Sequence, residues 1–224
     1  MNATMTSVSS TSSKRVLDPI DRISEVLFGL IMVLTFTGSL SVAEAGREDV
    51  RTMLIGALGC NLAWGVIDGL LYLMAGWAER GRALATLRAV RDAKDATRAQ
   101  PAIADAIPPL LAAILEPGEF ATMYDRLKAL PDPPASAPLR KDDILGAIGV
   151  FLLVFLSTFP VVIPFIVMGD AVRALRFSNG IAIVMLFLCG FAYGRIVGRH
   201  QWLAGILMVV LGAVLSAATM ALGG

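Results

Sequence analysis

One apolar stretch carries the polar side chains best placed to do chemistry. Residues 52–77 form about 39 Å of helix, which exceeds a bilayer core of about 30 Å. Asp68 is the single charged residue within this stretch. Helical spacing places Asn61, Asp68 and Tyr72 on one face. A carboxylate on a polar face inside a membrane indicates either an ion or proton site or polar packing between helices.

Two glycines near this face indicate close packing against another helix. Gly65 and Gly69 form a small-residue pair that lets another helix approach closely. The preceding apolar run, residues 23–42, has Glu25 near its start. Only the short segment 44–51 separates the two runs, which predicts an antiparallel transmembrane hairpin.

The composition defines the class of protein. The chain has 224 residues, of which 56% are hydrophobic, and a mean hydropathy of +0.73, too apolar for a soluble domain. A net charge of +1 provides no general attraction for nucleic acid. One His and two Cys exclude zinc fingers, and we expect Cys60 and Cys189 to be free thiols.

Sequence motifs for enzymatic chemistry are missing. The chain contains no phosphate-binding loop of the GxxxxGK[ST] type and no GxSxG, HExxH or CxxC motif. We therefore expect neither an enzyme nor a permanently bound cofactor. Membrane lipid is an expected partner and nucleic acid is not.

The pattern of apolar and charged segments predicts an all-α, polytopic membrane protein. It has five transmembrane helices in a 2+3 arrangement, with a helical cytoplasmic insertion between helices 2 and 3. The predicted parts are a mobile cytoplasmic N-terminus (1–22), a transmembrane hairpin (23–78), a cytoplasmic helical subdomain with a Pro-rich linker (79–143), and transmembrane helices 3–5 (144–224).

The third predicted span, residues 144–168, contains Pro160 and Pro164. Each proline removes a backbone hydrogen bond and frees a carbonyl inside the membrane. Such carbonyls either find donors on neighbouring helices or line a site.

Glycines and charges set the expected limits of the last two spans. We expect a loop at 169–179, a fourth span at 180–197 and a fifth at 202–222. Gly190, Gly194 and Gly198 have the spacing of a close-packing ridge.

Charge also sets the expected orientation. Ten of the 19 Lys and Arg residues lie in 79–143, which places this segment in the cytosol. The N-terminus is then cytoplasmic and the C-terminus outside. The absence of a targeting signal and the Ala-, Gly- and Arg-rich composition favour a bacterial inner membrane.

Several segments together resemble the vacuolar iron transporter family, over about residues 20–222. They are FGLIMVLTFTGSL in the first span, Gly69–Tyr72 followed by Ala78–Arg80, and TFPVVIPFI in the third span. The chain departs from the family at Phe28, where the family has Asp, and at Leu71, where the family has Glu.

The resemblance implies a homodimer that exports Fe²⁺ or Mn²⁺ from the cytosol in exchange for protons, along a path between the first helices of the protomers. Because the family carboxylates are missing, we expect a relocated site formed by Asp68, Asn61 and Met32, with Asp68 or Glu25 carrying the proton. Carboxylate and amide oxygens suit these metals.

The family's cytoplasmic domain collects metal with glutamates and methionines, which implies Glu116, Glu119 and Met123 as further candidates here. The alternative function is a non-transporting membrane scaffold or regulatory protein whose cytoplasmic helices bind a partner. In that case the polar faces would serve only to pack helices together.

Overall fold

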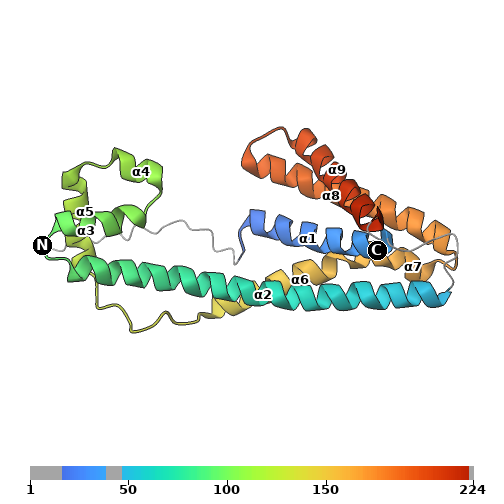
Figure 1. Ribbon diagram of the computed structural model, residues 1–224, viewed down its shortest axis with the longest axis horizontal. Coiled ribbons are helices and arrows are strands. Elements are labelled where there is room, and N and C mark those ends of the chain that lie inside the picture. The colour runs from blue at the N-terminus through green and yellow to red at the C-terminus, as the bar shows by residue number, and fades with distance from the viewer. Residues whose placement is uncertain (1–16, 39–46, 222–224) are drawn as a thin grey trace, which may run out of the picture. The chain divides into compact units, whose positions relative to one another are not determined.

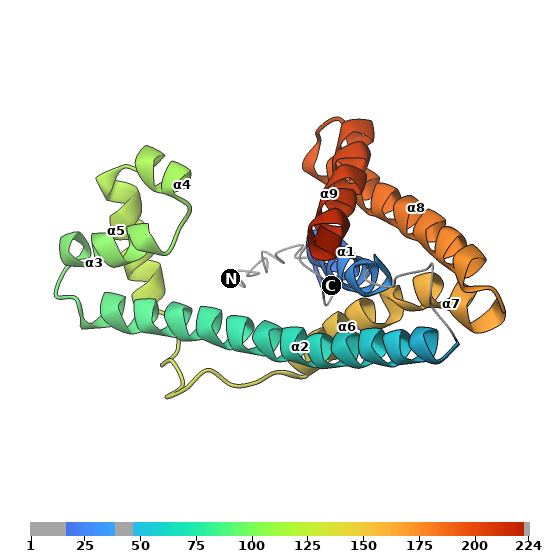
Figure 2. The ribbon, with the colours of Figure 1, turned by 45° about the vertical axis from the view of Figure 1, so that its right-hand side comes forward.

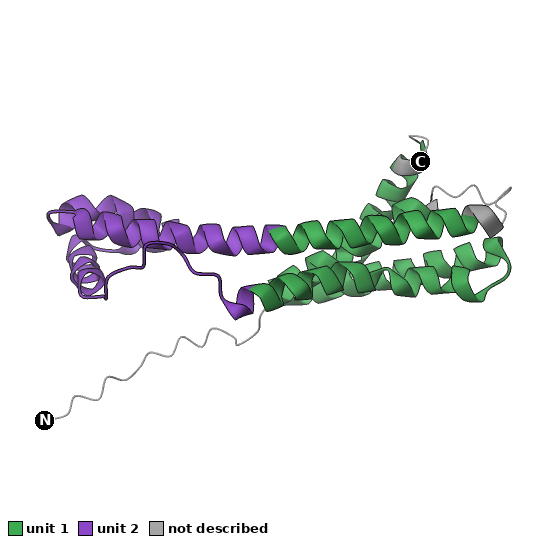
Figure 3. Cartoon of the chain, turned by 90° about the horizontal axis from the view of Figure 1, so that it is seen from below, with its two compact units in different colours: residues 1–70, 144–224 green, residues 71–143 purple. Residues whose placement is uncertain are grey.

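The computed structural model describes residues 17–38 and 47–221, and all regular structure within them is helical. The all-α class is therefore confirmed. The chain forms two compact units (Figure 3). The first unit comprises residues 1–70 and 144–224, and the second unit is Leu71–Asp143.

Four of the described helical segments are long and apolar enough to cross a membrane. They are Val50–Asp92, Lys141–Val167, Ala171–Val197 and Gln201–Ala218. The expected first span, 23–42, begins in a described helix but extends beyond residue 38, so the fifth span stays a prediction. Residues 1–16 of the predicted mobile N-terminus and residues 44–46 of the predicted loop also lie outside the described residues. Residues 19–22 and 47–51 are helical, so the prediction of a mobile segment and of a loop is wrong for them.

The first two helices are α1 (Pro19–Gly38) and α2 (Arg47–Asp92). Pro19 occupies the first position of α1, where its missing N–H costs nothing, and Asp18 Oδ1 accepts a hydrogen bond from Ile20 N (3.0 Å). Helix α2 runs without interruption for 46 residues (Figure 1). The second apolar span and the charged segment after it therefore form one helix.

The third span is broken into α6 (Lys141–Ser157) and α7 (Phe159–Val167). Pro160 lacks an N–H, so α6 cannot continue with regular hydrogen bonds. Thr158 N donates to Phe155 O (3.4 Å), one residue short of the α-helical pattern, before Val162 N restores it by bonding to Thr158 O (3.1 Å). The break therefore follows directly from the proline.

Helix α8 (Ala171–Val197) begins earlier than its sequence suggests. The expected loop at 169–179 is wrong, because residues 171–179 are helical. Asp170 is the N-cap, and its Oδ1 accepts from Arg173 N (3.0 Å). Arg173 and Arg176 therefore belong to the first turns of a helix rather than to a turn between two spans.

Helix α9 (Gln201–Ala221) packs antiparallel to α8 (Figure 2). A Cβ added at Gly190 would lie 2.6 Å from Ala204 O, so these backbones approach as closely as the predicted glycine ridge requires. Gly198 is not part of that ridge. It ends α8 in the left-handed conformation (φ 70°), which favours glycine.

The core of the first unit joins α1, α7 and α8. Its buried side chains include Leu30, Val33, Val161, Val162 and Leu186. This packing fixes α1 against the helices that follow the break in the third span.

The second unit adds α3 (Ala96–Asp105), α4 (Pro109–Ile114) and α5 (Pro117–Lys128). The end of α2 and these helices enclose a small core of Val90, Ala99, Ile103, Phe120 and Tyr124. This segment is thus largely helical, and its placement as a cytoplasmic insertion stays a prediction.

The Pro-rich linker, residues 130–140, is bound to α2 along its length. Arg91 contacts Asp132 and the carbonyl of Leu130. Arg88 Nη2 donates to Pro134 O (2.6 Å) and Ala135 O (2.9 Å).

Two further contacts of α2 involve the linker's C-terminal half and the first turn of α6. Trp77 Nε1 donates to Ala137 O (3.2 Å). Arg80 forms a two-pronged ion pair with Asp143, with both N–O distances 2.8 Å. The linker is therefore fixed mainly through its own carbonyl groups.

Candidate functional site

The side of α2 that carries Gly65 and Gly69 packs against α6. A Cβ at Gly65 would lie 3.0 Å from Phe151 Cδ2, and one at Gly69 would lie 3.0 Å from Ala147 O. These pairings run antiparallel, so each turn forward along α2 matches one turn backward along α6. The close approach expected from the glycine spacing is confirmed, and its partner is α6.

A second side of α2 packs against α1. The rings of Trp64 and Phe28 meet edge to face, with centroids 5.7 Å apart. A Cβ at Gly56 would lie 3.4 Å from Phe36 Cε1. This pairing is also antiparallel, as the predicted hairpin requires.

Asn61 and Asp68 point between these two sides. Successive residues turn by about 100° around a helix axis, which places both residues between the side facing α1 and the side facing α6. Asn61 is completely buried, and neither its Oδ1 nor its Nδ2 has a hydrogen-bond partner. Asp68 is half-buried. The acid expected to avoid lipid is therefore partly sheltered by protein.

The contacts between α1 and α2 place the four predicted metal-path residues at two heights along α2, called levels below. Asp68 lies opposite the first turns of α1, and the Glu25 carboxylate is within range of electrostatic interaction with it. Asn61 lies opposite Ile31 and Met32. The two levels are seven residues apart along α2, or about 10 Å.

The level of Asp68 and the level of Asn61 differ in charge. Glu25 and Asp68 form an acidic pair, and the ion pairs found among the described residues include neither of them. Asn61 and Met32 form a neutral level with one amide oxygen and one thioether sulfur. Carboxylates bind hard dications, whereas the neutral level offers weaker ligands.

Within the described residues, no three His, Cys, Asp or Glu side chains cluster in a way that would hold a metal ion. A metal at the acidic pair would have to complete its shell with water, backbone oxygen or a second protein chain. The acidic pair by itself therefore lacks the ligand number of a closed structural metal site.

The three candidates predicted from the family's cytoplasmic domain have structural roles in the second unit. Glu116 and Glu119 form a capping box at the start of α5, in which Glu119 Oε2 accepts from Glu116 N (2.8 Å). Met123 packs against the core of the second unit. Glu116 and Glu119 remain exposed to solvent.

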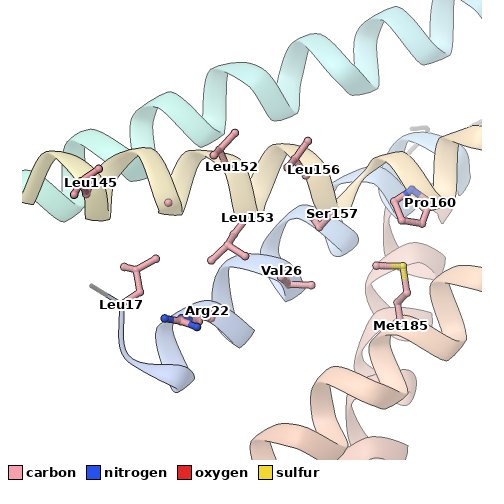
Figure 4. A pocket seen from close by; sticks show the side chains of 11 residues that line it. Leu17, Arg22, Val26, Leu145, Leu152, Leu153, Leu156, Ser157, Pro160 and Met185 are labelled. Atoms are coloured by element: carbon pink, nitrogen blue, oxygen red, sulfur yellow. The ribbon is translucent and has the colours of Figure 1, made fainter. Parts of the chain in front are cut away.

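A cavity of about 560 Å³ lies between α1 and α6 in the first unit (Figure 4). Apolar side chains dominate its walls, Arg22 is the only charged residue among them, and Met185 of α8 closes one side. None of the predicted metal ligands lines it. The cavity and the acidic pair are therefore separate features.

Comparison with known protein families shows to which family the chain belongs. A family model, described as the VIT family, matches residues 91–224. The chain belongs to the VIT family, the family of vacuolar iron transporters. No individual curated protein matches the sequence.

The match to the VIT family begins at the end of α2 and covers everything that follows. Asp68, Asn61, Met32 and Glu25 all precede it. The resemblance expected over about residues 20–222 is thus supported for the later part of the chain. Membership of this family indicates metal-ion transport. The family and the four long apolar helices of the chain together indicate a membrane location.

Sequence reasoning did not find the side chains that meet at the broken third span. A Cβ at Gly29 would lie 2.1 Å from Ser157 Oγ, so α1 touches α6 at its last turn. Ser157 and Thr158 are both buried there. The two prolines were the only signal in the sequence, and they indicated missing backbone hydrogen bonds without indicating the partners.

Proposed function

We propose that this VIT-family protein is a secondary transporter that exports a divalent metal, Fe²⁺ or Mn²⁺, from the cytosol. The proposal rests on the acidic pair: Glu25 on α1 and Asp68 on α2 lie within electrostatic range of each other. Both come from helices made largely of apolar residues. A dication between them would neutralise two charges that otherwise repel each other.

The electrical work of export calls for a coupling ion. Moving a dication out of a cell with a negative interior costs about 4.6 kcal/mol per 100 mV, which is twice the cost for one elementary charge. Protons entering in exchange would offset this cost. Glu25 and Asp68 would carry them, because a carboxylate that releases metal can take up a proton.

The neutral level would serve as the next position along the path. Met32 and Asn61 are about 10 Å from the acidic pair by helical rise. An ion passing from carboxylates to an amide oxygen and a thioether is held more weakly, which favours release over trapping. In a homodimer, the acidic pair would occur twice.

The proposed orientation follows from charge. The second unit and the N-terminus would face the cytosol and the C-terminus the outside, because residues 79–143 hold most of the basic side chains. The proposed location is a bacterial inner membrane.

The test is metal flux into liposomes containing the purified protein. Wild type should accumulate Mn²⁺ or Fe²⁺ when a proton gradient is imposed, and Asp68→Asn should reduce the rate at least tenfold. Asp125→Asn is the matched control, because Asp125 is an exposed acid on α5.

Equal flux with Asp68→Asn would refute the assignment of the acidic pair. No flux of any divalent metal by wild type would refute transport and leave the scaffold function.

A further inference from the structure

The last turn of α6 presents oxygen atoms that lack their usual donors. Pro160 has no N–H, so Leu156 O receives no bond from the residue four positions on. The C-terminal end of a helix carries partial negative charge. Interrupted membrane helices use such carbonyls to bind cations. A helix end alone is not a site, so independent evidence is needed.

Two buried hydroxyl groups add acceptors at the same place. Ser157 Oγ donates to Val154 O (2.8 Å) and Thr158 Oγ1 donates to Phe155 O (2.7 Å). Each hydroxyl has one hydrogen and two lone pairs. Because the hydrogens are already directed at α6, both oxygens are left as acceptors.

Asn61 is the independent evidence. The pairings of Gly65 with Phe151 and of Gly69 with Ala147 place Asn61 opposite Phe155, in the last turn of α6. Its amide is fully buried with both polar atoms unpartnered. A buried amide without partners is costly, and most such groups bind protein, water or an ion. Full burial also excludes lipid or a second chain as the partner.

We propose that the break between α6 and α7 binds a monovalent cation of the size of sodium. Its ligands are Asn61 Oδ1, the hydroxyl oxygens of Ser157 and Thr158, and Leu156 O, and a water molecule bonded to Asn61 Nδ2 completes the site. All these oxygens are neutral, so they hold a dication only weakly and suit a monovalent cation better. The carboxylates of the acidic pair lie about 10 Å away by helical rise.

This site deepens the proposed function by naming a possible second coupling ion, and its role in coupling rests on that function. Binding itself does not depend on metal transport. Sodium entering a cell down its gradient could supply part of the work of metal export.

The experiment measures thermal unfolding of the purified full-length protein in detergent with a chelator of divalent metals. NaCl is compared with choline chloride at equal ionic strength. Above the dissociation constant, each tenfold rise in sodium should raise Tm by about 3–6 °C. Asn61→Leu and Thr158→Val should both abolish this rise.

Thr37→Val is the matched control. Thr37 is a buried hydroxyl whose Oγ1 donates to Leu34 O (3.2 Å), but it lies further along α1, away from the break. It should lose stability without losing the response to sodium. Thr158→Val and Thr37→Val keep the test decisive if Asn61→Leu does not fold.

Two results would overturn the proposal. One is an equal Tm in sodium and choline for wild type, together with a higher Tm for Asn61→Leu, which would mean that the amide is simply unpaired. The other is a sodium response that survives in Thr158→Val. Asp68→Asn should keep the sodium response while losing metal flux, so failure of one proposal is distinguishable from failure of the other.

Discussion

The two halves of α2 make their contacts by opposite means. In the first unit, Gly65 and Gly69 bring the helix against the backbone of α6. In the second unit, Arg88 and Arg91 bind the linker, and Arg80 binds Asp143 in the first turn of α6. Helices in lipid gain nothing from hydrophobic burial and rely on close packing. A guanidinium group at an aqueous surface instead offers several donors in a fixed geometry.

The comparison predicts that adding one methyl group will do more harm at a glycine contact than deleting a whole side chain at the linker. Gly29→Ala should have the largest effect. Its Cβ would lie 2.1 Å from Ser157 Oγ and 2.5 Å from Val154 O, so α1 and α6 must separate. We expect a loss of about 3 kcal/mol in unfolding free energy, measured by thermal unfolding in detergent.

Gly59→Ala is the control for that substitution. A Cβ at Gly59 meets no atom within 4 Å. Alanine there should be neutral or stabilise the helix by up to about 1 kcal/mol. Similar losses of unfolding free energy for Gly29→Ala and Gly59→Ala would mean that close packing does not distinguish the first unit from the second.

Arg80→Ala should have an intermediate effect. It removes both bonds to Asp143, whose Oδ2 would keep only the bond from Arg140 N (2.7 Å). The Arg80 side chain is 27% exposed, so water partly replaces the lost contacts. We expect a loss of about 1–2 kcal/mol in unfolding free energy.

Arg80→Lys sharpens the interpretation. Lysine keeps the charge but cannot form the two-pronged pair, so it should recover less than half of the loss. Full recovery would show that charge alone, and not geometry, holds the first turn of α6 against α2. High salt should reduce the difference between wild type and Arg80→Ala.

Trp77→Phe should have the smallest effect. It removes the bond from Nε1 to Ala137 O (3.2 Å) and keeps an aromatic ring. Trp77 is largely exposed, so the expected loss is about 0.5 kcal/mol. Limited proteolysis should show faster cleavage of the linker, and an unchanged cleavage rate would mean that this bond does not fasten it.

Local patterns in the sequence predicted much of the fold. Glycine spacing correctly indicated close packing at Gly65 and Gly69. The prolines indicated missing backbone hydrogen bonds in the third span, but not that the span divides into two helices. Residues 171–179 were misjudged because Arg173 and Arg176 made the segment look like a loop. Asp170 supplies the cap that begins the helix before these charges.

The candidate site was predictable only in part. Helical periodicity placed Asn61 and Asp68 on one side of α2. It could not show that Glu25 lies near Asp68, or that Asn61 lies opposite Phe155. Both depend on the register between helices, which is set by packing along the whole contact and not by any short motif.

The linker illustrates how a segment can be demanding in length and permissive in composition. Arg88, Arg91 and Trp77 bond chiefly to main-chain oxygens, which every amino acid possesses. Exchanging one linker residue for another leaves those oxygens in position. Inserting or deleting a single residue would shift all of these oxygens relative to their donors on α2. The linker should therefore tolerate many substitutions but no change in length.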